Sequence, residues 1–84
     1  LMKILYFAWL RQRIGVPMEE FNLPEEVHTV GDLIDYLTAK GENYSKAFSQ
    51  KKVIRAAVNF EYVPLDHKLI NKDEIAFFPP VTGG

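Results

Sequence analysis

Residues 2–10, Met-Lys-Ile-Leu-Tyr-Phe-Ala-Trp-Leu, are apolar at every position except Lys3. Successive side chains of a strand point to opposite faces, so a strand over this segment is apolar on both faces. A strand that is buried on both sides belongs in the middle of a sheet. We therefore expect a central strand over residues 2–10, with a second layer packed on one face of its sheet.

The clearest helix signal in the chain follows Thr29, a residue type that favours the helix N-cap. Asp32 stands three residues later, where an acidic side chain stabilises the start of a helix. Lys40 is expected in the last turn and Gly41 at the stop. The helix would bury one apolar stripe at helical spacing, made of Val30, Leu33, Ile34 and Leu37.

Shorter elements are expected where alternating side chains meet turn residues. They are a strand at 18–23 that forms a hairpin with the first strand, a helical turn at 44–50, strands at 54–59 and 62–63 joined by a turn at Phe60-Glu61, and a last strand at 74–78. This order predicts an α+β architecture, a mixed sheet of about five strands with one main helix packed across it. It is the arrangement of the ubiquitin-like β-grasp fold.

One domain over residues 2–84 is expected, with a flexible tail at 79–84 and with Leu1 as a residue left by cloning. The net charge of −1 and the lack of a basic stripe argue against nucleic-acid binding. No apolar run approaches the roughly 20 residues of a membrane span. The start of the chain lacks the pattern of a signal peptide, so the expected location is the cytoplasm.

The chain contains no cysteine, which excludes disulfides, thiolate metal sites and a cysteine nucleophile. His28 and His67 have no second ligand or catalytic partner at a suitable spacing, so both are expected to be surface residues and no metal site is predicted.

The C-terminal tail is the segment with the strongest functional signal. Pro79 and Pro80 cannot continue a sheet ladder and stiffen the exit from the last strand. Gly83 and Gly84 have no side chain and can enter a narrow slot in another protein. Residues 81–84 would extend roughly 13 Å, enough to deliver a terminal carboxylate into a partner's active site. The competing interpretation is an inert terminus or a cloning remnant.

The segment 77–84, Phe-Phe-Pro-Pro-Val-Thr-Gly-Gly, resembles the C-terminal signature of the small subunit of molybdopterin synthase. The resemblance covers nearly the whole chain. Further similar blocks are Lys3 to Ala8 followed by Arg11, Thr29-Val30 with Leu33, Ala57-Val58-Asn59, and Asp73 to Phe78. Two positions depart from the family pattern, Gln12 and Lys72, and both are expected in loops or at the rim of the domain.

The resemblance implies a function in molybdenum cofactor biosynthesis. An E1-like enzyme would use ATP to adenylate the Gly84 carboxylate, and a sulfur donor would convert the adenylate to a thiocarboxylate. The tail, with Pro79, Pro80, Val81, Thr82 and Gly83 leading to Gly84, would then enter the large subunit and give its sulfur to cyclic pyranopterin monophosphate. The small subunit would bind no cofactor stably and would supply no acid, base or metal, and the family suggests two small and two large subunits.

The aromatic pair before the tail predicts where a partner docks. Alternation puts Phe77 and Phe78 on opposite faces, so at most one of them belongs fully to the core. We expect Phe78 to anchor the partner, with Arg11 and Tyr62 on the same surface, as the family implies. The alternative is that Phe78 caps the core of its own domain.

Three other functions share parts of these features. A thiamine-pathway sulfur carrier has the fold and the Gly-Gly end, but its tail does not resemble residues 78–82. A ubiquitin-like modifier would form an isopeptide bond between Gly84 and a lysine. A plain interaction domain would have a tail without a role.

Overall fold

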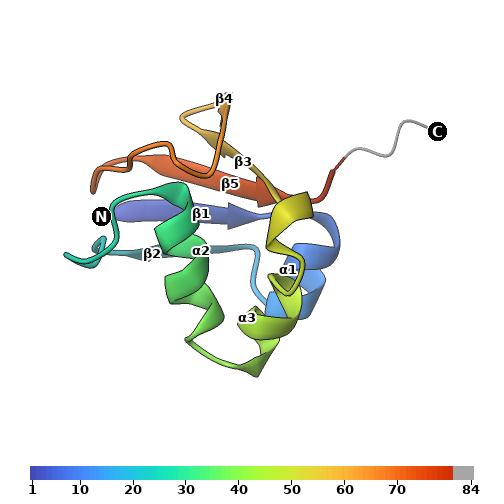
Figure 1. The fold of residues 1–84 in the computed structure, drawn as a ribbon. Coiled ribbons are helices and arrows are strands. Elements are labelled where there is room, and N and C mark those ends of the chain that lie inside the picture. Colours follow the sequence, from blue (N-terminus) through green and yellow to red (C-terminus); the bar gives the residue numbers. More distant parts are fainter. Residues whose placement is uncertain (81–84) are drawn as a thin grey trace.

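The computed structural model describes residues 1–80 of the chain. Figure 1 shows a sheet with α2 lying across one face, and with α1 and α3 near the end of the sheet where β1 and β5 finish. In chain order the elements are β1 (Met2–Tyr6), α1 (Ala8–Ile14), β2 (Met18–Phe21), α2 (Val30–Thr38), α3 (Glu42–Ala47), the 3-10 turn η1 (Lys51–Val53), β3 (Arg55–Val58), β4 (Glu61–Val63) and β5 (Glu74–Phe78).

The five strands form one mixed sheet in the order β2-β1-β5-β3-β4. β1 and β5 run parallel, with Ile4 opposite Ile75 and Tyr6 opposite Phe77. The other neighbouring strands are antiparallel, and β1 pairs with β2 as the predicted hairpin. The mixed sheet with one helix across it is the predicted β-grasp arrangement, and β1 has a partner on each side as expected.

The first strand is shorter than the sequence pattern indicates. β1 ends at Tyr6, and Ala8 begins α1 with a left-handed φ of 55° that breaks the strand. Within α1, Leu10 and Ile14 are buried at i and i+4, on one face of the helix. The apolar run at residues 2–10 therefore contains β1 and the first turn of α1. The expected burial on both faces is also wrong, because Lys3 and Leu5 on the second face of β1 are only half-buried.

The start of α2 confirms the predicted helix. Thr29 and Asp32 form a capping box in which each side chain accepts a hydrogen bond from the backbone N–H of the other residue. The backbone N–H of His28 also donates to Asp32, and this bond is the largest cause of a lowered pKa for that carboxyl. The four residues of the predicted apolar stripe are all buried.

The end of α2 differs from the prediction. The helix stops at Thr38 with Ala39 in a right-handed conformation, so Lys40 lies beyond the last turn. Gly41 is extended, with a φ of 172°, and serves as the N-cap of α3. A lysine and a glycine after an apolar stripe are the usual stop signal, but here a second helix follows at once and its start takes the glycine.

The remaining elements are close to their predicted positions. α3 begins two residues earlier than expected, while Ala47 and Phe48 are buried as predicted. The turn between β3 and β4 is Asn59-Phe60 rather than Phe60-Glu61, because Glu61 is already paired in the ladder.

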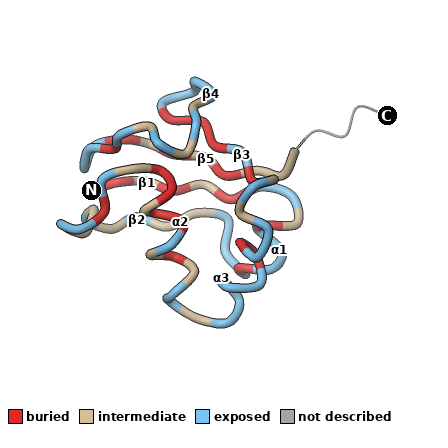
Figure 2. Tube along the Cα trace, viewed as in Figure 1, coloured by how far each residue is buried: buried red, intermediate tan, exposed pale blue. Residues whose placement is uncertain are grey.

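The core lies between the sheet and the helices (Figure 2). Tyr6, Phe48 and Phe77 form an aromatic cluster at its centre, with ring centroids 5.3 to 6.5 Å apart. The largest of the other nearly fully buried side chains are Met2, Ile4, Leu10, Val30, Leu33, Ile34, Leu37 and Ile75.

Glu19 connects this core to the surface. Its Oε2 accepts hydrogen bonds from the hydroxyls of Tyr6 at 2.8 Å and Tyr44 at 2.9 Å, and its Oε1 lies 3.4 Å from the Lys40 ammonium. Burial, with the Glu19 carboxylate beside it, raises the pKa of Tyr6 well above the ordinary value for tyrosine. The same two causes raise the pKa of Tyr44 to about 12.

The buried Tyr6 predicts a loss of stability at alkaline pH. Its pKa is raised in the folded state, so its contribution is complete below the unfolded pKa of about 10 and falls as the pH rises above that value. We expect Tyr6 to lower the free energy of unfolding by up to about 1.4 kcal/mol per pH unit in this range. Urea unfolding between about pH 9 and about pH 11 measures the slope, and Tyr6→Phe should reduce it. Equal slopes in the two proteins would contradict this role.

Candidate functional site

The C-terminal tail leaves the domain beside the start of α1. β1 and β5 are parallel, so both end at the same edge of the sheet, and the Phe7 N–H donates to the Phe77 carbonyl at 3.1 Å. β5 stops at Phe78, as the following prolines predict. Pro79 and Pro80 are half-buried at this edge and belong to no strand or helix. The predicted tail residues Val81, Thr82, Gly83 and Gly84 lie outside the residues that the structure describes.

An apolar row crosses the sheet face that points away from the core. Leu5 stands opposite Ala76, Ala76 opposite Ala57, and Ala57 opposite Tyr62. Phe78 is two residues after Ala76 on the same strand and therefore shares this face. The helices pack on the other face (Figure 1). We call these side chains the open-face row: Leu5, Ala57, Tyr62, Ala76 and Phe78. The row ends at Phe78, the last residue of β5 before the tail.

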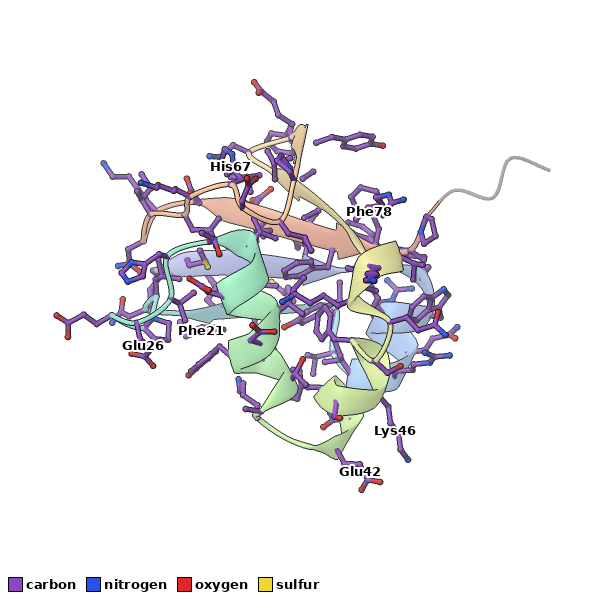
Figure 3. The ribbon with its side chains drawn as sticks, viewed as in Figure 1. Phe21, Glu26, Glu42, Lys46, His67 and Phe78 are labelled. Carbon is purple, nitrogen blue, oxygen red and sulfur yellow. The ribbon has the colours of Figure 1, made fainter. Side chains whose placement is uncertain are left out.

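Phe78 and Tyr62 contact each other on the open face, with ring centroids 5.4 Å apart and planes tilted by 41°. Phe78 is half-buried at the end of β5 (Figure 3), whereas Phe77 is fully buried in the core. The alternation therefore predicted correctly that only one of these two rings enters the core. Tyr62 is 79% exposed, so the pair presents an accessible aromatic surface beside the tail.

Arg11, the third predicted interface residue, lies on a helix rather than on a strand. It is exposed on α1, where its carbonyl accepts the N–H of Gly15 as part of the helix cap. No carboxylate within residues 1–80 forms an ion pair with its guanidinium. The structure thus brings Phe78 and Tyr62 together and places Arg11 as an exposed cation on the helix that follows β1, and its part in a partner interface stays a prediction.

Two residues at the same edge were missed by the sequence analysis. Phe7 is exposed directly after β1, but its apolar neighbours made it resemble a residue of a buried strand. Arg55 is exposed opposite Phe78 in the β3–β5 ladder and donates to the Lys52 carbonyl at 3.1 Å. Only the strand register places Arg55 beside the tail.

The described part of the chain offers no other site with evident chemistry. Across residues 1–80, no three histidine, aspartate or glutamate side chains gather closely enough to hold a metal ion. Within the same range, no helix combines the length and the apolar character that a membrane crossing requires. His28 is exposed and His67 is half-buried.

Comparison with known proteins supports the resemblance seen in the sequence. The profile of the ThiS family matches residues 4–84. The molybdopterin synthase sulfur carrier subunit of Escherichia coli K12 is 38% identical over 84 residues, which is all of both chains. The protein of the same name from Dictyostelium discoideum is also 38% identical, over 98% of this chain and 94% of its own.

Solved structures with a similar fold include a molybdopterin converting factor subunit and a small archaeal modifier protein. A protein from Pyrococcus furiosus described as molybdopterin converting factor, subunit 1, superposes with a TM-score of 0.75 at 35% identity, covering 95% of this chain and 97% of its own. SAMP1 from Haloferax volcanii superposes with a TM-score of 0.73 at 27% identity, covering 99% and 98% of the two chains. The chain therefore belongs to the ThiS family, in which it is grouped with the molybdopterin synthase sulfur carrier subunits.

Proposed function

We propose that this protein is the sulfur-carrier subunit of a molybdopterin synthase. The observation that carries the proposal is the match, over the full length of both chains, to a protein with that name. The geometry supports it, because β5 delivers the tail from an edge of the sheet that also presents the Phe78–Tyr62 pair. We therefore infer that the large subunit docks on the open-face row and receives the tail.

The proposed chemistry takes place on the carboxylate of Gly84, taken here as the C-terminal residue. A carboxylate is a poor electrophile, and an E1-like enzyme activates it by attaching AMP from ATP and releasing pyrophosphate. Hydrosulfide delivered by a sulfur donor then attacks the acyl carbon, the bond from that carbon to the AMP oxygen breaks, and a thiocarboxylate remains. With no cysteine in the chain, this carboxylate is the one group suited to hold the sulfur.

In the synthase, the thiocarboxylate would give its sulfur to cyclic pyranopterin monophosphate, and two such transfers would complete the dithiolene. The carrier contributes position rather than catalysis. Its sheet holds the tail at one edge, the prolines stiffen the exit, and the glycines leave clearance in a narrow slot. Acid and base groups come from the large subunit. A cytoplasmic location and a complex of two small and two large subunits belong to the same proposal.

Replacement of Phe78 tests the docking surface. We expect Phe78→Ala to weaken binding to the large subunit by about 2 kcal/mol, roughly thirtyfold in Kd, because buried aromatic anchors dominate interface energetics. Isothermal titration of the purified subunits measures the change. Phe21→Ala is the matched control, because Phe21 is another half-buried aromatic, on the edge strand β2 and distant from Phe78 in Figure 3. Wild-type affinity of Phe78→Ala would remove Phe78 from the interface.

A second candidate function is that of a ubiquitin-like protein modifier. The similarity to SAMP1, a small archaeal modifier protein, supports it at 27% identity. In that function Gly84 would end in an isopeptide bond to a lysine of another protein. Mass spectrometry of tryptic digests of proteins isolated with a tagged carrier distinguishes the two functions, because only a modifier leaves its C-terminal peptide, residues 73–84 after cleavage at Lys72, attached to lysines.

A further inference from the structure

The loop between β3 and β4 has an unusual residue in a strained position. Asn59 and Phe60 are the only two residues between paired Val58 and Glu61, and both have left-handed φ angles, 51° and 73°. Positive φ at both central residues defines a type I′ hairpin turn, in which Asn-Gly is strongly preferred. Phe60 therefore occupies the position that favours glycine, where a side chain costs conformational energy.

The turn is fixed to the rest of the sheet through Asn59. The Asn59 side-chain amide donates to Asp73 Oδ1 at 2.9 Å, and its side-chain oxygen accepts the Glu74 N–H at 3.0 Å. The Asn59 N–H also donates to the Glu74 carbonyl at 2.8 Å. Asp73 is buried and accepts the Ile70 N–H as well. These bonds hold the turn in place, so Phe60 is presented in one backbone conformation.

The Phe60 side chain does nothing evident for the fold. It is 88% exposed, the highest value among the large apolar side chains of residues 1–80. A single exposed apolar residue is ordinary on a protein surface. An exposed aromatic ring at a position where glycine would relieve strain is less ordinary, because neither burial nor turn geometry favours it. A strained backbone conformation that brings no stabilising burial is a feature of functional positions.

Phe60 lies in the turn that joins β3 and β4, the two strands that supply Ala57 and Tyr62 to the open-face row. It precedes Tyr62 by two residues on the same hairpin, and the Tyr62 ring contacts Phe78. The five residues of β5 span roughly 17 Å from the turn end of the sheet to the tail. A standard protein interface covers about 800 Å² on each partner, so a partner seated on Phe78 and Tyr62 also reaches the hairpin tip.

From this geometry we propose that Phe60 is a second aromatic anchor for the large subunit, which would receive the ring in an apolar pocket about one strand length from the tail slot. This inference rests on the proposed function. The turn would present the ring rigidly, so little side-chain and backbone order is lost on binding.

The replacement Phe60→Gly separates binding from folding. It removes the ring and relieves the strained φ, so the melting temperature should stay unchanged or rise while the Kd for the purified large subunit increases about tenfold. Phe60→Asn, which also tolerates a left-handed φ, should weaken binding equally, and Phe60→Tyr should retain it. Phe21→Ala again serves as the aromatic deletion outside the proposed surface.

The outcomes distinguish the inference from the function on which it rests. If Phe60→Gly binds like the wild type while Phe78→Ala binds weakly, Phe60 is no anchor and the docking surface stands. If both variants bind like the wild type, docking on the open-face row is wrong as well. A lower melting temperature for Phe60→Gly would overturn the inference, because the ring would then support the fold.

Discussion

Deletion of Gly84 is expected to abolish sulfur transfer while leaving the unfolding transition of the domain unchanged. The shortened chain would end in a carboxylate on Gly83, about 3.3 Å short of its position in the partner's active site. Misplacement by even 1 Å can lower a rate about a hundredfold, so a larger displacement should reduce product below detection. The fold should not respond, because β5 ends at Phe78 and the core residues precede it.

The assay is molybdopterin formation by the purified large subunit, with activating enzyme, ATP and sulfur donor present. Deletion of Leu1 at the other terminus is the matched control and should leave the rate unchanged. Gly83→Trp should block transfer for a different reason, because a bulky ring cannot enter a slot shaped for bare backbone. Wild-type product formation by the Gly84-deleted chain would exclude the tail as the sulfur donor.

Replacement of Phe77 by alanine should have the largest effect on stability. Phe77 is fully buried between Tyr6 and Phe48, and truncation of such a ring costs about 3–5 kcal/mol. Small domains have total stabilities of about 5–15 kcal/mol, so the variant should unfold at far lower denaturant concentration.

The adjacent Phe78→Ala variant is the matched control for this measurement. Phe78 lies on the opposite face and is only half-buried, so its truncation should cost well under half as much stability. Equilibrium unfolding in urea compares the two proteins. A greater destabilisation by Phe78→Ala than by Phe77→Ala would contradict the assignment of one ring to the core and the other to the surface.

Elements with strong local signals were predictable from the sequence. The start of α2 follows from Thr29, Asp32 and an apolar stripe, all of which act within one or two turns. The end of β5 follows from Pro79, which cannot donate to a ladder. In both cases the residues that determine the structure are neighbours in the chain.

Elements that depend on distant contacts were predicted less well. Ala8 adopts a left-handed φ that its residue type disfavours, so nothing local marks the end of β1. Phe60 is equally unexpected at a left-handed position, and the bond from Asn59 to Asp73 that fixes the turn joins residues far apart in the sequence. The sequence pattern therefore placed this turn one residue too late.

The same difference between local signals and distant contacts applies to the candidate site. The choice of Phe78 over Phe77 as the surface ring followed from the sequence motif and strand alternation, whereas residues 81–84 of the tail lie outside the described residues and their role stays a prediction. The contact between Phe78 and Tyr62 depends on the register of three strands, and that register required the structure. Arg11 was expected on the same surface, and it lies on α1, which replaces the end of the predicted strand, so its place at a partner interface stays a prediction.

Intact-mass analysis tests whether the carboxylate of Gly84 carries the sulfur. The purified chain is incubated with the E1-like activating enzyme, ATP and the sulfur donor, and the same mixture without ATP is the reference. We predict a mass increase equal to the exchange of one oxygen for one sulfur, located by fragmentation at Gly84 and missing from the Gly84-deleted chain. An unchanged mass with an active enzyme and donor, or a sulfur located at any other residue, would contradict the proposed function.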